Sequence, residues 1–129
     1  MFDIIVKKSK INGSGVFAGK DFKKDEIVVR WDLSRLIKKS DVQKISKEEK
    51  PYIAHVGGTY ILMQPPARFV NHSCDSNTYV KDFCDVAKRD ISKGEEITSD
   101  YSETETSDFK MNCNCGSKNC RGIIKRKKR

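Results

Sequence analysis

The sequence predicts a mainly β, single-domain fold with one short helical insert. Three observations support this: short β-branched or apolar runs recur along the chain, turn residues separate them, and helical composition is confined to one stretch that a proline ends. The length of 129 residues suits one domain with one modest core. Many short strands with a single helical insert favour a β-rich fold other than a sandwich.

The first third of the chain predicts two short strands, Phe2 to Val6 and Glu26 to Trp31. Between them, Asn12-Gly13-Ser14-Gly15 is a strong turn signal, and the charged segment Lys20 to Asp25 is also typical of a turn. We therefore expect a strand, a glycine-rich loop and a second strand, with no helix in this region.

The middle of the chain combines the helical insert with further strands. Ser40 to Lys50 has the best helical composition, and Ser46 to Glu49 matches a capping box. Pro51 prevents a longer helix, so we expect one or two short helices in an insert over about residues 38–58. Strands are predicted at Thr59 to Met63, Thr78 to Val80 and Cys84 to Ala87, with a break at Pro65-Pro66 and a turn at Lys93-Gly94.

Charge and hydropathy limit the location and the partners of the chain. No stretch approaches the ~20 apolar residues that cross a bilayer, and Met1 to Lys10 lacks the apolar core of a secretory signal. We therefore expect a soluble, intracellular protein with no membrane contact. The net charge is +8, and Lys125 to Arg129 carry five of these charges. Such a tail is typical either of a solvated segment or of a contact with nucleic acid or another acidic surface.

Three of the five cysteines cluster near the C-terminus, at Cys113, Cys115 and Cys120. An odd number of cysteines without a secretory signal argues against a disulfide framework. Thiolates at this spacing suit tetrahedral zinc, and a closed structural site needs a fourth ligand. The alternative is that these cysteines are reduced and bind no metal. Candidates for the fourth ligand are Cys74 and Cys84, with His72 and His55 behind them, although Cys84 in a predicted strand is expected to be buried instead.

Four separated segments of the chain carry recognisable motifs. Asn12 to Ala18 contains a Gly-x-Gly loop, and Arg68 to Asn77 reads RFVNHSCDSN. Gly94 to Tyr101 reads GEEITSDY, and Cys113 to Gly122 has the spacing C-x-C-x4-C-R-G. In this order the segments resemble the early Gly-x-Gly loop, the RFxNHSCxxN and GEE-[IL]-x-x-DY motifs and the post-SET loop of the SET-domain protein lysine methyltransferases. The resemblance runs from about Phe2 to Gly122, nearly the whole chain.

This resemblance implies a SET-domain fold of small curved sheets, in which the C-terminal segment is threaded beneath a preceding loop as a pseudoknot. The threading would bring Asn71-His72 beside Asp100-Tyr101. The implied domains are a SET domain over residues 1–104, a post-SET zinc loop over 105–122 and a basic tail over 123–129. The implied zinc ligands are Cys74, Cys113, Cys115 and Cys120.

The resemblance also implies that S-adenosylmethionine binds beside the glycine-rich loop. Glycines allow close approach of the backbone, and asparagine and histidine side chains can bond polar groups of the cofactor. Tyr52 lies where family members often carry a cofactor-contacting tyrosine, and a helix-packing aromatic is the alternative. The implied cofactor-binding residues are Gly13, Ser14, Gly15, Tyr52, Arg68, Asn71 and His72.

Tyr101 matches the catalytic tyrosine of the DY motif, whose hydroxyl is implied to orient the target amine, and Asp100 would orient the turn. An apolar channel beside a cationic sulfonium lowers the pKa of a lysine from ~10.4, so no dedicated base is expected. Ser99 stands in the substrate channel where many members place Phe or Tyr. The small hydroxyl either enlarges the channel, which favours higher methylation states, or leaves it incomplete.

The expected activity is methyl transfer from S-adenosylmethionine to a lysine ε-amine, with a histone tail as the default target and another basic protein as an alternative. In a eukaryotic source this places the chain in the nucleus or on chromatin. The second class of function is a catalytically silent SET-like module that binds chromatin, nucleic acid or protein. A third, a small zinc-binding nucleic-acid protein, rests on Cys113 to Arg129 alone. Binding of S-adenosylmethionine would distinguish an active methyltransferase from a catalytically silent module.

Overall fold

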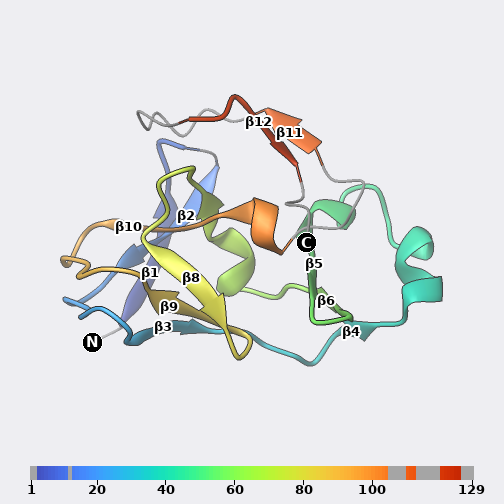
Figure 1. The fold of residues 1–129 in the computed structure, drawn as a ribbon, viewed down its shortest axis with the longest axis horizontal. Helices are drawn as coiled ribbons and strands as arrows, with labels where there is room; N and C mark the ends of the chain where they lie inside the picture. The colour runs from blue at the N-terminus through green and yellow to red at the C-terminus, as the bar shows by residue number, and fades with distance from the viewer. Residues whose placement is uncertain (1–2, 12, 105–109, 113–119, 126–129) are drawn as a thin grey trace.

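The computed structural model describes residues 3–11, 13–104, 110–112 and 120–125. Within these ranges the chain forms four small β-sheets joined by loops and short 3₁₀ helices (Figure 1). The prediction of a mainly β fold is confirmed. None of the helices in the described ranges is long and apolar enough to cross a membrane.

The first sheet has the strand order β1-β2-β10-β7. Strands β1 (Ile4–Lys8) and β2 (Ser14–Ala18) form an antiparallel hairpin. Strand β10 (Glu96–Ser99) pairs with β2 on one side and lies parallel to β7 (Asn71–His72) on the other. The parallel pairing places the segment after β10 beside the segment that contains β7, although some twenty-five residues separate them in the sequence.

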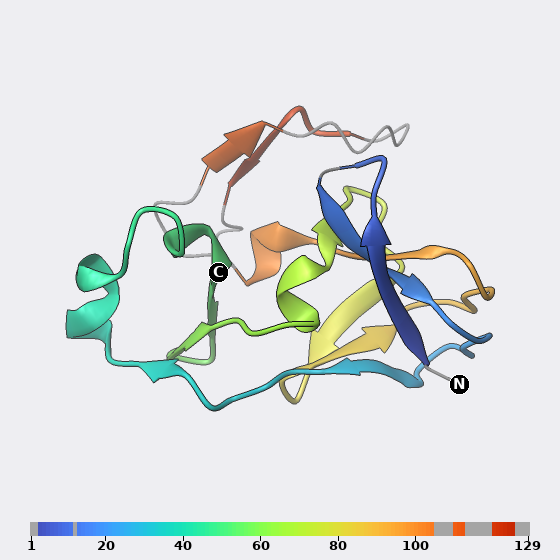
Figure 2. The same ribbon diagram turned by 180° about the vertical axis from the view of Figure 1, so that it is seen from behind.

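Two further three-stranded sheets complete the body of the molecule. One contains β3 (Ile27–Arg30), β9 (Cys84–Ala87) and β8 (Thr78–Lys81), in that order. The other contains β4 (Leu36–Ile37), β6 (Thr59–Leu62) and β5 (Ile53–Val56). Figures 1 and 2 show the β4-β6-β5 sheet on one side of the molecule and the other two sheets on the opposite side. A small hairpin of β11 (Lys110–Asn112) and β12 (Ile123–Lys125) lies along one edge.

The helical insert contains 3₁₀ turns where the sequence favoured short helices. They are η1 (Lys39–Lys44) and η2 (Lys50–Tyr52). The Ser46 hydroxyl accepts a bond from the Glu49 N–H at 3.3 Å, which is one of the two bonds of a capping box, but only one turn follows. Neither η1 nor η2 buries a residue, so neither has the packed apolar face that stabilises a longer helix.

Two further 3₁₀ helices occupy the middle of the molecule, between the two groups of sheets. They are η3 (Ala67–Phe69) and η4 (Tyr101–Glu103). Helix η3 directly precedes β7, and η4 directly follows β10. Each of these helices is therefore adjacent in sequence to one strand of the parallel β7-β10 pair.

Strands β2 and β10 were not predicted from the sequence, and neither were β4, β5, β7, β11 and β12. Strand β5 lies within the predicted helical insert over about residues 38–58, so the insert is not helical throughout. Val16 of β2 and Ile97 of β10 are opposite each other in the antiparallel register, and both are fully buried. Burial of one such side chain stabilises the fold by ~1.5–3 kcal/mol. Strand β10 is otherwise polar, but Thr98 and Ser99 are also buried, because the strand is paired on both sides.

Asn77 connects β8 to β10 through a buried set of hydrogen bonds. Its side chain accepts a bond from the Thr98 N–H at 2.9 Å and donates one to the Glu96 carbonyl at 2.8 Å. Its own N–H donates to the Thr98 hydroxyl at 3.2 Å. Since Asn77 is only 4% exposed, these bonds fix the sheet that contains β8 against the sheet that contains β10.

Candidate active site

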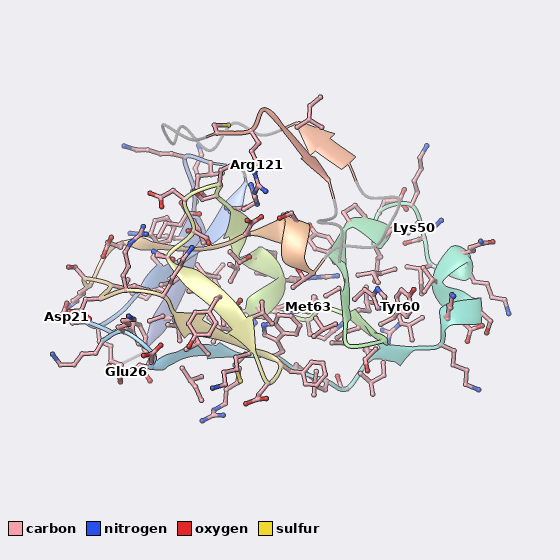
Figure 3. All side chains as sticks on the ribbon, viewed as in Figure 1. Asp21, Glu26, Lys50, Tyr60, Met63 and Arg121 are labelled. Atoms are coloured by element: carbon pink, nitrogen blue, oxygen red, sulfur yellow. The ribbon has the colours of Figure 1, made fainter. Side chains whose placement is uncertain are left out.

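A cavity of about 600 Å³ lies between the sheets and beside both central helices. This volume is within the range of small-molecule sites. Met63, which lines the cavity, lies near the middle of the molecule in Figure 3. Seven of the residues predicted to bind cofactor or to form the substrate channel line it: Gly13, Ser14, Tyr52, Arg68, Asn71, Ser99 and Tyr101.

The glycine-rich loop is held against β7 by Asn71. The Asn71 amide donates to the Ser14 carbonyl at 3.1 Å and to the Glu96 carboxylate at 3.0 Å. Gly15 does not line the cavity and packs against Ser9 and Glu96 instead. A Cβ at Gly15 would collide with the Glu96 carboxylate and would lie 2.9 Å from the Ser9 Cβ. Gly15 is therefore required for this close packing, and its predicted cofactor contact stays a prediction.

Arg68 has unused hydrogen-bonding capacity inside the cavity. Its guanidinium lies over the Tyr52 ring at 4.2 Å from the centroid. The nearest carboxylate oxygen, on Glu49, is 3.9 Å from Nη2, which is too long for a hydrogen bond. Nε and Nη2 are both buried, and neither has a hydrogen-bond partner among the described residues. Buried donors without partners indicate a place for an anionic or polar ligand group.

His72 does not line the cavity, but it contacts Tyr101, which does. Its Nδ1 accepts a bond from the Tyr101 N–H at 3.0 Å, and its Nε2 lies 3.4 Å from the Cys74 sulfur. Burial lowers the pKa of His72, against an opposing effect of Asp100, so the neutral ring is favoured. The predicted contact of His72 with the cofactor therefore stays untested, while the structure gives it the role of positioning Tyr101.

Tyr101 is placed by both strands of the parallel pair. Its hydroxyl donates to the Val70 carbonyl at 2.6 Å, and its ring lies 5.3 Å from the His72 ring. The predicted juxtaposition of Asn71-His72 with Asp100-Tyr101 is thus confirmed. The phenol has a fixed position on the cavity wall, beside Ser99.

Asp100 orients the turn that carries Tyr101, as predicted. Its carboxylate accepts bonds from the Ser102 N–H at 3.1 Å and from the Arg121 guanidinium at 2.7 Å. Burial opposes ionisation of Asp100, but the bonds from Arg121 and Ser102 outweigh it and lower the pKa. Arg121 lies between the C-terminal hairpin and the body of the molecule in Figure 3. It fixes the C-terminal segment to η4.

Two of the four predicted zinc ligands are described by the structure. The Cys74 sulfur accepts a bond from the Arg121 N–H at 3.3 Å, which brings the segment of Cys120 against it. Cys113 and Cys115 lie outside the described residues. Within the described part of the chain, no three Cys, His, Asp or Glu side chains are grouped to hold a metal. Of the other candidates, Cys84 is buried as expected and His55 stacks on Tyr60 at 4.2 Å between ring centroids.

Residues of the β3-β9-β8 sheet also line the cavity, and they were not predicted from the sequence. Trp31, one residue after β3, and Asp85 of β9 are the two polar examples. The Trp31 indole donates to the Asp85 carboxylate at 3.0 Å. Burial raises the pKa of Asp85 to about 7, against the opposing effect of that bond. The carboxylate of Asp85 stands out in the otherwise apolar segment Cys84 to Ala87, and this could have marked it as a functional residue. Whether its side chain points into the cavity depends on the register of the sheet, which the sequence does not show.

The model of the SET domain family matches residues 13–102 of this chain. The chain belongs to the SET-domain family. Residues 13–102 contain every described residue that lines the cavity except Thr104.

Curated relatives of this SET domain are much longer proteins. Human histone-lysine N-methyltransferase 2D is 31% identical over 137 residues, which span 92% of this chain and 2% of the relative. Histone-lysine N-methyltransferase trithorax of Drosophila virilis is 33% identical over 92% of this chain and 4% of the relative. TRX1 of Oryza sativa subsp. japonica is 31% identical over 91% of this chain and 13% of the relative. The chain therefore corresponds to a small part of each.

Solved structures share the fold. The methyltransferase domain of human histone-lysine N-methyltransferase SETMAR has a TM-score of 0.75 and 23% identity, over 98% of this chain and 59% of that one. KRYPTONITE, solved in complex with mCHG DNA and SAH, has a TM-score of 0.74 and 23% identity, over 95% of this chain and 29% of that one. These likenesses confirm the predicted SET fold.

Proposed function

We propose that this SET domain is a protein-lysine N-methyltransferase that uses S-adenosylmethionine as methyl donor. The observation that carries the proposal is that five of the seven predicted cofactor residues and the predicted catalytic residue line the same cavity. Arg68, Asn71 and the Gly13-Ser14 loop form one part of its wall, and Ser99 and Tyr101 form another. Donor and acceptor would therefore meet in one cavity.

The chemistry of the cavity suits such a donor. S-adenosylmethionine supplies an electrophilic methyl group on a sulfonium, and it carries a carboxylate and polar ribose and adenine groups. The two unpartnered nitrogens of Arg68 would suit its carboxylate. The Gly13-Ser14 backbone would hold it closely, while Asn71 keeps that loop in place through the Ser14 carbonyl. Tyr52 would be a stacking surface, since Arg68 already orders its ring.

The target lysine would enter beside Tyr101. The Tyr101 hydroxyl is fixed by the Val70 carbonyl, and these oxygens are the acceptors that could orient an incoming amine. Apolar lining residues, including Met63 and Val80, would keep the aliphatic stem of the lysine out of water. Ser99 leaves room in this wall, which favours more than one round of methylation.

The domain limits and the partners follow from the same proposal. The SET domain spans residues 1–104, the post-SET loop 105–122 and the basic tail 123–129. The target is a histone tail or another basic protein, which would place the activity on chromatin in a eukaryotic cell. The tail either contacts nucleic acid or an acidic surface, or serves as a solvated segment.

We also propose one structural zinc on Cys74, Cys113, Cys115 and Cys120. Support comes from the contact between the Cys74 sulfur and the Arg121 backbone, because it brings the Cys120 segment to Cys74. Arg121 also reaches Asp100 and the Ser102 hydroxyl. A metal here would therefore hold the post-SET loop against the turn that carries Tyr101.

The test is transfer of labelled methyl from S-adenosylmethionine to core histones and to a lysate of basic proteins. We compare the wild type with Tyr101→Phe and with the matched control Tyr79→Phe. The Tyr79 hydroxyl bonds Asp25 on the surface, away from the cavity lining. Tyr101→Phe should lower the rate by about 10²-fold or more, the cost of losing one oriented group at a reacting centre.

The controls separate the function classes. Tyr79→Phe should retain wild-type incorporation, and both variants should bind S-adenosylmethionine. Wild-type protein that binds the cofactor but methylates none of these proteins would contradict the proposal for these targets. Wild-type protein that binds no cofactor would support the silent-module class in its place.

A further inference from the structure

Asp85 is a buried carboxylate on the cavity wall, and the proposed reaction has so far given it no role. It is 3% exposed and lies in β9, where Cys84, Val86 and Ala87 are also buried. Directly opposite it are Val29 on β3 and Val80 on β8. Paired residues share one face of a sheet, and Val80 also lines the cavity. The side chain of Asp85 is therefore directed to the same space as Tyr101 and Ser99.

The carboxylate is held in one orientation by Trp31. The indole N–H donates to Oδ2 at 3.0 Å, and both residues line the cavity. None of the described residues donates a hydrogen bond to the other oxygen, Oδ1. No lysine, arginine or histidine in the described part of the chain forms an ion pair with Asp85.

A buried carboxylate without a cation is unfavourable, and such groups are normally paired or protonated. Burial accordingly raises the pKa of Asp85 to about 7. The other charged or titratable side chains that line the cavity are Glu48, Tyr52, Arg68 and Tyr101. Among the described residues of the cavity wall, Arg68 is the one fixed cation, and it lies beside Tyr52 and Glu49 rather than Asp85.

The proposed reaction brings a cation into this cavity. A target lysine arrives as an ammonium ion, with an ordinary pKa of ~10.4, and must lose a proton before its nitrogen can form a bond to the methyl carbon. We propose that Asp85 accepts this proton, so that it is a catalytic residue of the site beside Tyr101. This inference rests on the proposed function. It differs from the expectation of a site without a dedicated base.

The proton balance is simple. One N–H bond of the ammonium breaks, the proton passes to Oδ1 of the ionised Asp85, and the nitrogen keeps the electron pair. That pair forms the new N–C bond as the sulfonium releases its methyl group. The protonated Asp85 then returns the proton to water before the next turnover. Trp31 acts as a positioning residue, because its bond keeps Oδ2 occupied and leaves Oδ1 for the amine.

The experiment compares the wild type with Asp85→Asn and with the control Asp82→Asn. Asparagine at position 85 keeps an acceptor for the Trp31 indole and removes the titrating oxygen. Asp82 undergoes the same chemical change three residues earlier, on the exposed β8–β9 turn. Calorimetric binding of S-adenosylmethionine to each protein shows that the donor site is intact.

The activity readout is the pH profile of kcat/KM, from pH 6 to pH 10, for the best methylated histone. The wild type and Asp82→Asn should rise to a plateau above neutral pH. Asp85→Asn should be slower by about 10²-fold at pH 7.5, which is the usual contribution of a general base. Its rate should then increase tenfold per pH unit up to about pH 10, because free amine must come from solution.

A second readout does not depend on turnover. Trp31 is the single tryptophan of the chain, so intrinsic fluorescence reports its bond to Asp85. The wild type and Asp82→Asn should show a fluorescence transition near pH 7 that n-butylammonium chloride moves to lower pH. Asp85→Asn should show neither the transition nor the shift.

The outcomes distinguish the two proposals. An active wild type whose pH profile is shared by Asp85→Asn would overturn the role of Asp85 and leave the methyltransferase function standing. A transition that n-butylammonium does not shift would also overturn it. A wild type that binds S-adenosylmethionine but methylates none of the core histones or basic proteins would contradict the methyltransferase proposal for these targets, and the role of Asp85 with it.

Discussion

The position of Asp85 predicts an unusual effect of pH on stability. Between about pH 4 and pH 7 the folded protein keeps a proton on this carboxyl, whereas the unfolded chain has already lost it. The folded state therefore binds more protons, and its stability falls as pH rises through this window. Asp85→Asn removes the titration, so the variant should gain stability relative to the wild type as pH increases.

The magnitude follows from the shift itself. Burial raises the pKa of Asp85 to about 7, from an ordinary value of ~3.9. Three pKa units, at ~1.36 kcal/mol each, correspond to ~4 kcal/mol over the whole window. More than half of this, ~2–3 kcal/mol, falls between pH 5 and pH 8. Such a change is a large part of the stability of a small domain.

Urea unfolding measured at half-unit intervals from pH 5 to pH 8 tests this reasoning. The free energy of unfolding of Asp85→Asn, minus that of the wild type, should increase steadily with pH. The same difference for Asp82→Asn should stay flat, because that side chain is exposed on a turn. A flat difference for Asp85→Asn would show that the carboxylate is hydrated in the folded protein, and it would refute the account of its burial.

Two further predictions concern the frame of the site. Asn77→Ala should lower the free energy of unfolding by ~2–3 kcal/mol in urea titrations, because it leaves buried backbone groups of β10 without partners; an effect below ~0.5 kcal/mol would contradict the proposed connection. Cys74→Ser should reduce the zinc found by metal analysis and lower the melting temperature. Chelation should do the same to the wild type, and the buried control Cys84→Ser should keep its zinc.

The sequence predicted those parts of the fold that depend on local signals. Strands β3, β6, β8 and β9 lie where β-branched or apolar runs indicated them, and the turn at Gly94 has the positive φ that glycine favours. Strand β10 was missed because Glu96, Thr98 and Ser99 are typical of an exposed loop. It forms because partners on both sides satisfy its backbone, and no local pattern reports such partners.

The site residues that could be predicted from the sequence are those that lie within continuous sequence motifs. Arg68, Asn71 and Tyr101 line the cavity as the resemblance implied. Trp31 and Asp85 belong to no motif, and they meet because β3 and β9 are paired in one register. The pairing of strands, which sets which side chains share a face, was beyond the reach of the sequence.

The hydrogen bonds also divide the polar residues of the site into two groups. The Asn71 amide already bonds the Ser14 carbonyl and Glu96, and both His72 nitrogens face protein groups, so these side chains mainly hold the frame. Among the described residues that line the cavity, Arg68 has two buried nitrogens and Asp85 has one carboxyl oxygen with bonding capacity left over. A guanidinium with two unpartnered nitrogens suits a carboxylate, and a carboxylate with one unpartnered oxygen suits an ammonium. The substrates of the proposed reaction carry these two groups, so the cavity matches the charges of both.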